Sequence, residues 1–227
     1  MDKAAIYDGR NRRYSVYNFC NHCDTFYISD ATVNGLMEYS SGYVEISPGK
    51  KANMNISFYG LEDDGIEEPS DIHLYYRVYD SDDWFADDVA RGDEHVYPFG
   101  KEKADRYSRE SEESDVILLS LNGVKVTMIE SELGEGIELA LYVENDTDKE
   151  VMFSIDDASV NSYMIDPYWA KSLLPYSSAY SSVTWRNKDL LDNLIFEVDN
   201  IEFTLSAEDY NDWWAPDVAS KVINLDF

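Results

Sequence analysis

The chain has 227 residues, enough for one or two domains with hydrophobic cores of their own. Hydrophobic residues make up 44% of the chain and aromatic residues 14%, which is typical of a folded globular protein and excludes a disordered acidic tail. The 46 acidic and 18 basic side chains give a net charge of −28, which repels phosphate backbones and anionic lipid surfaces, so we expect no nucleic-acid partner.

The N-terminal segment Met1–Asp8 has no apolar core of the kind that signal peptides contain. No later segment has the length and hydrophobicity of a membrane span, so we expect no membrane insertion of this chain. The acidic, tyrosine-rich composition fits an exported bacterial protein. It favours an extracellular or cell-envelope location.

The first half of the chain alternates apolar and polar residues with the period of two that is typical of strands. The alternating runs are Tyr14 to Val16, Phe26 to Ile28, Met54 to Phe58 and Ile72 to Val78. Turn residues such as Ser47-Pro48-Gly49 separate the runs. One short helical segment is predicted in this half, from Leu61 to Ile66 with Gly65 as its cap.

Two cysteines, Cys20 and Cys23, lie in the turn between the first two runs. With His22 they could bind zinc if a fourth ligand came from elsewhere, but the chain has no second cysteine pair. Redox chemistry of the thioredoxin type would require a helix N-terminus at this place. A disulfide within the turn, or two free thiols, is therefore favoured.

An acidic loop that also carries aromatic residues follows the run that ends at Val78. Its carboxylates could supply calcium ligands, although Phe85 stands at the sixth position, where an EF-hand needs glycine. Aspartates also cap turns through their own backbone, and this interpretation is simpler. The candidate calcium ligands are Asp80, Asp83 and Asp88, and the aromatic residues are Trp84 and Phe85.

Residues 101–114 are mostly charged and almost without apolar side chains. This composition indicates a solvated linker between two domains, at 1–100 and 115–227.

The second half begins with two apolar runs, Val116 to Leu121 and Val124 to Met128, joined by the hairpin dipeptide Asn122-Gly123. The further alternating runs are Ile137 to Val143, Val151 to Ile155 and Ile201 to Ala207. Lys188 to Leu194, behind Asn187, is the helical segment predicted in this half.

The two halves repeat the same residues. A shift of 127 positions, and of 129 after one loop, pairs Phe26 with Phe153, Ile28 with Ile155, Asn34 with Asn161, Ile72 with Ile201 and Trp84 with Trp213. We therefore predict two copies of one domain. The two leading runs of the second copy align with positions before Met1. Three explanations are open: the chain is cut from a longer protein, part of the segment 100–115 takes the place of these runs, or the first copy keeps an open sheet edge, where a partner could add a strand.

The second copy repeats the acidic loop, with candidate calcium ligands Asp209, Asp212 and Asp217 and aromatic residues Trp213 and Trp214. The aromatic rings of both loops could form a stacking platform for a sugar. We expect instead that one tryptophan of each loop plugs the end of its own sandwich, because a buried indole removes a large apolar area from water.

Catalytic motifs are missing from the sequence: it has three histidines and no Gly-x-Ser-x-Gly, His-Glu-x-x-His or glycine-rich phosphate loop. Carboxylate pairs carry little information, because 46 acidic residues produce such pairs by number alone. We expect no enzymatic activity and no required cofactor, with calcium as the one ion that the acidic loops could bind.

Four segments of the first copy carry a resemblance to a known repeat. They are Asp30–Met37, Ser47–Asn53, Leu61–Ile66 and Val78–Trp84. The pattern is similar to a tandem repeat of uncharacterised function in predicted secreted or surface-anchored proteins of Gram-positive gut bacteria. The resemblance implies an immunoglobulin-like sandwich and an envelope location, and it implies no catalytic residue.

The prediction for the fold is therefore an all-β chain of two tandem antiparallel immunoglobulin-like β-sandwich domains related by internal duplication, each with at most a short helical turn. The predicted function is a noncatalytic extracellular or cell-envelope module that binds a protein or glycan ligand or acts structurally. Two alternatives are a carbohydrate-binding module that uses the loop aromatics with calcium, and an acidic decoy that occupies a basic partner.

Overall fold

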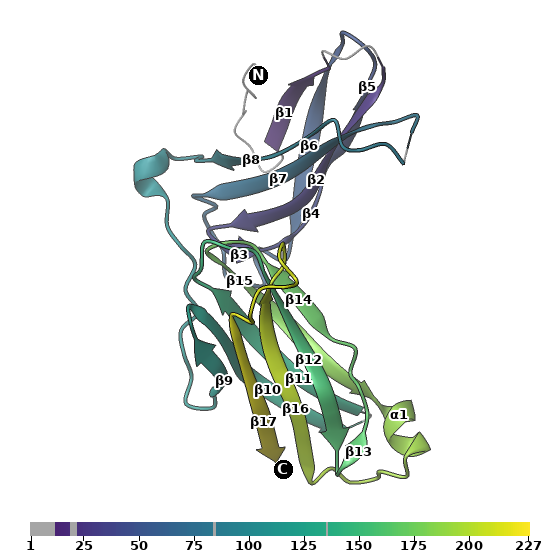
Figure 1. Cartoon of the computed structure of the whole chain (residues 1–227). Helices are drawn as coiled ribbons and strands as arrows, with labels where there is room; N and C mark the ends of the chain where they lie inside the picture. The colour runs from purple at the N-terminus through teal and green to yellow at the C-terminus, as the bar shows by residue number, and fades with distance from the viewer. Residues whose placement is uncertain (1–11, 19–21, 84, 135) are drawn as a thin grey trace. The chain divides into compact units, whose positions relative to one another are not determined.

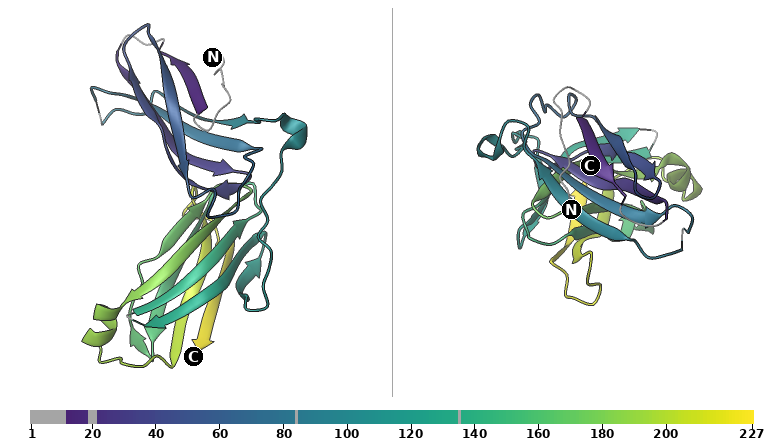
Figure 2. Two further views of the ribbon diagram at one scale, coloured as in Figure 1. Left: turned by 180° about the vertical axis from the view of Figure 1, so that it is seen from behind. Right: turned by 90° about the horizontal axis from the view of Figure 1, so that it is seen from above.

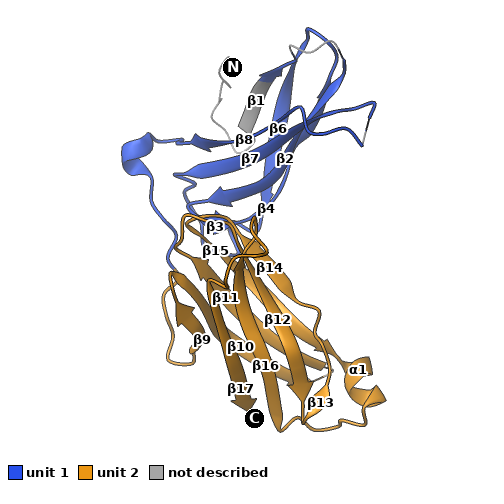
Figure 3. Cartoon of the chain, viewed as in Figure 1, with its two compact units in different colours: residues 1–108 blue, residues 109–227 orange. Residues whose placement is uncertain are grey.

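The computed structural model describes residues 12–18, 22–83, 85–134 and 136–227 (Figure 1). The chain forms two compact units, residues 1–108 and 109–227, shown in separate colours in Figure 3. The boundary between them falls inside the segment that the composition predicts to be a linker. Almost every described element is a strand, which confirms the all-β prediction.

Unit 1 contains two antiparallel sheets. The first has the order β1 (Arg12–Tyr17), β6 (Lys51–Tyr59) and β4 (Tyr39–Ser41). The second has the order β8 (Ala90–Val96), β7 (Ile72–Asp80), β2 (Asp24–Val33) and β3 (Leu36–Met37), and β5 (Tyr43–Ile46) also pairs with β2. A short 3₁₀ helix, η1 (Lys101–Lys103), follows the last strand. Alternate residues of these strands, such as Ile28, Ile56 and Leu74, form the buried core.

Unit 2 also contains two antiparallel sheets, which Figure 2 shows from behind as two layers. One layer has the order β9 (Val116–Leu121), β10 (Val124–Gly134), β11 (Gly136–Asn145) and β15 (Ser177–Arg186). The other has the order β13 (Tyr163–Met164), β12 (Val151–Val160), β16 (Asn200–Asp209) and β17 (Ala219–Asp226), and β14 (Ala170–Leu173) also pairs with β12. The core between the layers includes Phe153, Trp185 and Phe203, all almost fully buried.

Strand pairing follows the same register in both units. In unit 1, Val33 of β2 lies opposite Ile72 of β7, and in unit 2 Val160 of β12 lies opposite Ile201 of β16. All four side chains are buried. The residue numbers differ by 127 in the first strand and 129 in the second, the same shifts that align the two halves of the sequence.

Two buried asparagines hold the same position in the two units. Asn18 Nδ2 donates to the carbonyl oxygens of His22, at 2.8 Å, and Ile46, at 2.7 Å. Asn145 Nδ2 lies 2.8 Å from the carbonyl oxygen of Lys149 and 3.2 Å from that of Leu173, the residues shifted by 127. In each unit the side-chain amide thus links a loop carbonyl, of His22 or Lys149, to the carbonyl at the end of a strand, of Ile46 in β5 or Leu173 in β14.

A second pair of asparagines also makes matching bonds. Asn34 Oδ1 accepts from the backbone N–H of Asp71 at 3.0 Å, and Asn161 Oδ1 accepts from that of Asn200 at 3.1 Å. Both asparagines have a positive φ, of 54° and 49°, in the region that Asn tolerates better than most residues. Each therefore ties the turn after a strand to the segment that leads into the next sheet strand.

The two predicted helical segments have different outcomes. The one in unit 2 forms α1 (Asn187–Asp192), which buries Leu190. The one in unit 1 is wrong, because residues 61–65 form a turn and not a helix. Its predicted left-handed glycine is confirmed, since Gly65 has a φ of 76°.

Two predictions at the start of the chain concern residues outside the described ranges. The first is the disulfide between Cys20 and the half-buried Cys23. Cys20 lies outside the described residues, so this disulfide stays a prediction. In unit 2 the strand β11 has β10 as its second neighbour, and β10 pairs with β9. The corresponding place beside β1 involves residues before position 12, so the open edge also stays a prediction.

The buried carboxyl group of Glu38 in unit 1 has a perturbed pKa. Glu38 is buried, and its Oε1 has no hydrogen-bond partner among the described residues. Burial, followed by the nearby Asp64 carboxyl, raises the pKa of Glu38 to about 8. Burial also raises the pKa of Asp64. The corresponding residues of unit 2 are Ile165, which is buried, and Asn193.

We expect Asn145→Ala to lower the free energy of unfolding by about 2 kcal/mol, because the Leu173 carbonyl loses its side-chain donor and the carbonyls of Lys149 and Leu174 keep only Thr147 and Ser177 as side-chain donors. Urea unfolding of the full chain, followed by tryptophan fluorescence, measures the change. Thr184→Ala, at an exposed position of β15, serves as the control and should change it by well under 1 kcal/mol. Equal effects of the two substitutions would contradict the bracing role of Asn145.

We expect the stability of unit 1 to fall as the pH rises from about 4.5 to about 8. Folded Glu38 keeps its proton until pH 8, whereas the unfolded residue ionises near its ordinary value of 4.5, so the folded state binds more protons over this range. The double variant Glu38→Ile with Asp64→Asn, the residues of unit 2, should gain about 2 kcal/mol over the wild type at pH 8 and little at pH 4.5.

Thermal unfolding at the two pH values measures this difference between variant and wild type. Glu62→Gln, an exposed carboxyl in the same turn as Asp64, is the control for general charge repulsion. A gain that is the same at both pH values would show that Glu38 does not carry the pH dependence.

Candidate functional site

The loop between β16 and β17 holds its two tryptophans in a fixed backbone conformation. Asp209 Oδ1 accepts from the N–H of Asn211 at 3.0 Å, and Asp212 Oδ1 accepts from the N–H of Trp214 at 3.2 Å. The carbonyl of Asp212 also accepts from the N–H of Ala215 at 3.0 Å. These aspartates act as caps of consecutive turns, which is the simpler of the two roles that the sequence offers for them.

The loop between β7 and β8 of unit 1 is built in the same way. Asp80 Oδ1 accepts from the N–H of Asp82 at 2.9 Å, and Asp83 Oδ1 accepts from the N–H of Phe85 at 3.0 Å. The two loops therefore present their aromatic residues from equivalent turns.

The aromatic side chains of both loops face solvent. Trp213 is 64% exposed, Trp214 is 96% exposed and Phe85 is 100% exposed. Trp84 lies outside the described residues. The prediction that one tryptophan of this loop in unit 2 plugs its sandwich is therefore wrong, because the turn that Asp212 caps points both indoles away from the core.

Two other tryptophans fill the core of unit 2. Trp185 of β15 is 1% exposed and donates from Nε1 to the carbonyl oxygen of Ile165 at 2.8 Å. Trp169 is also buried and donates from Nε1 to Ser181 Oγ at 3.0 Å. Both indoles thus combine a buried ring with a satisfied N–H, which is the normal requirement for burying tryptophan. The sequence signal for Trp185 is its place two residues after Val183 in an alternating run.

The carboxylates predicted as calcium ligands have other partners. Asp88 accepts two bonds of 2.8 Å from the guanidinium of Arg77 and also binds Arg91, and these bonds lower the pKa of Asp88 to about 2. Asp209 pairs with Lys149 at 2.7 Å, and this bond lowers its pKa. Asp217 is exposed. Among the described residues, no group of three or more His, Cys, Asp or Glu side chains is placed to hold a metal ion.

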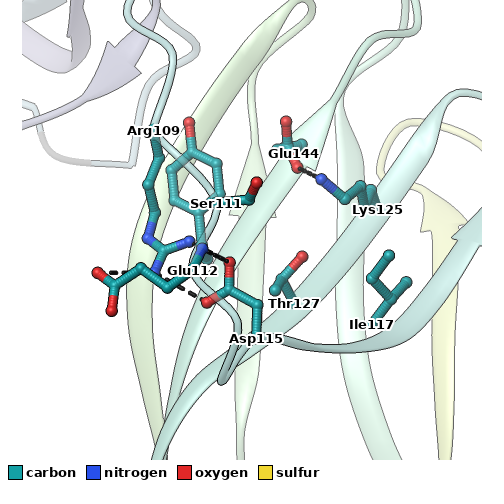
Figure 4. Close-up of a pocket in the computed structure, with 9 residues that line it drawn as sticks. Arg109, Ser111, Glu112, Asp115, Ile117, Lys125, Thr127 and Glu144 are labelled. Atoms are coloured by element: carbon teal, nitrogen blue, oxygen red, sulfur yellow. Dashed lines mark hydrogen bonds and ion pairs between the residues drawn. The ribbon is translucent and has the colours of Figure 1, made fainter.

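A polar pocket of about 210 Å³ lies on the outer face of β10 and β11 in unit 2 (Figure 4). Arg109 crosses one side of it and binds Asp115 through two bonds of 2.6 and 2.9 Å. Lys125 pairs with Glu144 at 2.8 Å. Thr127 is buried in the wall, and its Oγ1 has no hydrogen-bond partner among the described residues.

The pocket offers little for chemistry. Its cations are already paired with carboxylates, so neither guanidinium nor ammonium is available to an anion. Bonding to Asp115 raises the pKa of Arg109 and lowers that of Asp115, so both groups stay charged. The ion pair of Arg109 with Asp115 could not be predicted from the sequence. Arg109 lies in the segment 101–114, whose composition indicates a solvated linker, and Asp115 directly follows it.

The described residues contain no helix long and apolar enough to span a lipid bilayer.

Comparisons with known proteins give distant likenesses only. No protein-family model matches the chain, and no curated protein matches it. The SafA pilin of Salmonella enterica in complex with the SafB chaperone is 10% identical, with a TM-score of 0.28, over 95% of this chain and 89% of that one. The exo-chitosanase CsxA of Amycolatopsis orientalis is 13% identical, with a TM-score of 0.29, over 97% of this chain and 26% of that one.

Red sea bream transglutaminase is 8% identical, with a TM-score of 0.28, over 99% of this chain and 31% of that one. This chain thus spans only a small part of the two enzymes. At these identities and TM-scores the likenesses assign neither a family nor an activity to the chain.

Proposed function

We propose that this protein is a noncatalytic, extracellular or cell-envelope binding module made of two tandem immunoglobulin-like repeats, and that it binds glycans through the aromatic loop of unit 2. The matched registers and the matched asparagine bonds of Asn18 with Asn145 and of Asn34 with Asn161 support a duplicated domain.

The exposure of Trp213 and Trp214 is the observation that carries the proposal. Two adjacent indoles in contact with water are unfavourable unless a ligand covers them. Tyr210 extends the aromatic surface, since its ring lies 6.3 Å from that of Trp213. Because the caps of Asp209 and Asp212 fix the loop beforehand, binding would cost little conformational entropy.

The charge of the protein favours an uncharged ligand. A net charge of −28 repels nucleic acids and anionic lipid surfaces, whereas it has no such effect on a neutral sugar. Aromatic rings supply flat apolar surfaces against which the C–H faces of a pyranose can stack. A glycan therefore fits both the charge and the shape of this loop.

The acidic decoy is less well supported. A decoy needs carboxylates that are free to pair with a basic partner. The best-defined carboxylates of the loops instead bind cations of the protein itself, Asp88 with Arg77 and Arg91, and Asp209 with Lys149.

We expect the double variant Trp213→Ala with Trp214→Ala to bind glycans at least about tenfold more weakly than the wild type, because aromatic side chains at the centre of a binding surface contribute most of its affinity. Affinity electrophoresis in gels that contain neutral polysaccharides (xylan, mixed-linkage β-glucan, galactomannan or starch) measures the change. EDTA should leave binding unaffected, since backbone amides and cations already occupy the loop carboxylates.

Tyr168→Ala is the matched control, because Tyr168 is an exposed aromatic residue of unit 2 outside the loop. It should bind as the wild type does. Equal retardation of the wild type and the double variant in every gel would refute glycan binding by this loop.

A further inference from the structure

The outer face of the second sheet of unit 1 carries a row of large side chains. Tyr43 of β5 lies opposite Tyr27 of β2, Tyr27 lies opposite Arg77 of β7, and Arg77 lies opposite Arg91 of β8. Residues directly opposite each other in antiparallel strands point to the same side of the sheet. This row, which we call the tyrosine row, faces solvent: Tyr43 is 74% exposed and Tyr27 is 41% exposed.

Aromatic rings continue on the same face toward the other end of β7 and β8. His73 and His95 lie opposite each other, and their rings stack at 3.7 Å. The ring of Tyr75 lies 4.4 Å from that of His73, and the ring of Tyr97 lies 5.5 Å from that of His95. These four rings form a continuous aromatic ledge on the sheet.

The same face of unit 2 has none of these side chains. The row that corresponds to the tyrosine row consists of Ala170, Ser154, Ser206 and Ser220, again on four adjacent strands. Ser206 and Ser220 share a hydrogen bond of 3.1 Å. Because unit 2 forms the same sheet with small polar residues at these positions, the large side chains of unit 1 are not required by the fold.

The cations on this face are paired with carboxylates, and two further carboxylates, Asp30 opposite Tyr75 and Glu45 opposite Thr25, are exposed on it. The guanidiniums of Arg77 and Arg91 both bind Asp88. His73 Nε2 lies 2.8 Å from Asp93, and His95 Nδ1 lies 2.7 Å from Asp71. The exposed carboxylates repel an anionic ligand and can accept hydrogen bonds from hydroxyl groups, so the face suits an uncharged ligand rich in hydroxyl groups.

The dimensions of the face fit an oligosaccharide. Adjacent strands are about 5 Å apart, so the tyrosine row extends about 15 Å across its four strands. Neighbouring rows lie about 7 Å apart along a strand, on the scale of one sugar ring. Tyr79, which lies opposite Thr25, adds another side chain to the same face beside the tyrosine row.

We propose that the tyrosine row and the aromatic ledge of unit 1 form a second glycan-binding site, which takes a neutral oligosaccharide laid across β5, β2, β7 and β8. Tyr27 and Tyr43 would stack on the sugar rings. Arg77 and Asp88 would exchange hydrogen bonds with the hydroxyl groups at one end of the row. This site lies on side chains other than those of the tryptophan loop, so it does not depend on the proposed function of that loop.

The test uses the full chain with the loop aromatics removed by Trp84→Ala, Phe85→Ala, Trp213→Ala and Trp214→Ala. This background variant should still be retarded in at least one of the neutral polysaccharide gels. Adding Tyr27→Ser and Tyr43→Ala, the residues of unit 2, should weaken the remaining binding at least about tenfold. The matched control is Ser206→Ala with Ser220→Ala on the same face of unit 2, which should change nothing.

Three outcomes would overturn the inference: a background variant that binds no neutral polysaccharide, tyrosine substitutions that leave its binding unchanged, or retardation only by a charged polysaccharide such as pectate. Should the tyrosine double variant unfold, as circular dichroism would reveal, Tyr43→Ser alone serves instead, because that side chain is mostly exposed. If the background variant binds as strongly as the wild type, the tryptophan loop does not bind glycans. That result concerns the proposed function and not the tyrosine row.

Discussion

Antiparallel strand pairing determines which side chains of each unit the core constrains and which it leaves free. Along a paired strand, residues alternate between the core and solvent, so only every second position must be apolar. Some inward positions carry the same residue in both units, as Val33 and Val160 or Ile72 and Ile201 illustrate. At an outward position, Tyr27 stands where unit 2 has Ser154. The proposed tyrosine row lies at outward positions, and the proposed tryptophan loop lies outside the paired strands.

The loops explain how so acidic a chain can fold. A carboxylate is costly in a core, but at a turn it accepts bonds from backbone N–H groups that have no strand partner. Asp83 and Asp212 both serve in this way. Others, such as Asp88, are neutralised by guanidiniums. Glu38, a carboxyl buried in unit 1, shows through its raised pKa the cost of placing such a group away from these partners.

The sequence predicts the strands well and the site only in part, for physical reasons that particular residues show. Alternation identifies strands because it reports burial directly. Residue type alone is a poorer guide. One tryptophan of the pair Trp213 and Trp214 was expected inside because indoles are often buried, yet both are exposed, whereas Trp185, at an alternating position, is buried. The stacking of His73 on His95 cannot be predicted from the sequence, because it depends on the register between two strands.

Placing the two proposed binding surfaces outside the hydrophobic cores has an energetic rationale. A new site within a single core must exchange packed residues, which usually lowers stability. A site on outward positions exchanges only solvated side chains, so its effect on folding is small. At two such positions unit 2 has Ser206 and Ser220, which share a hydrogen bond, where unit 1 has Arg77 and Arg91. Because both sites belong to one polypeptide, a long glycan that reaches both would bind more tightly than either site alone allows.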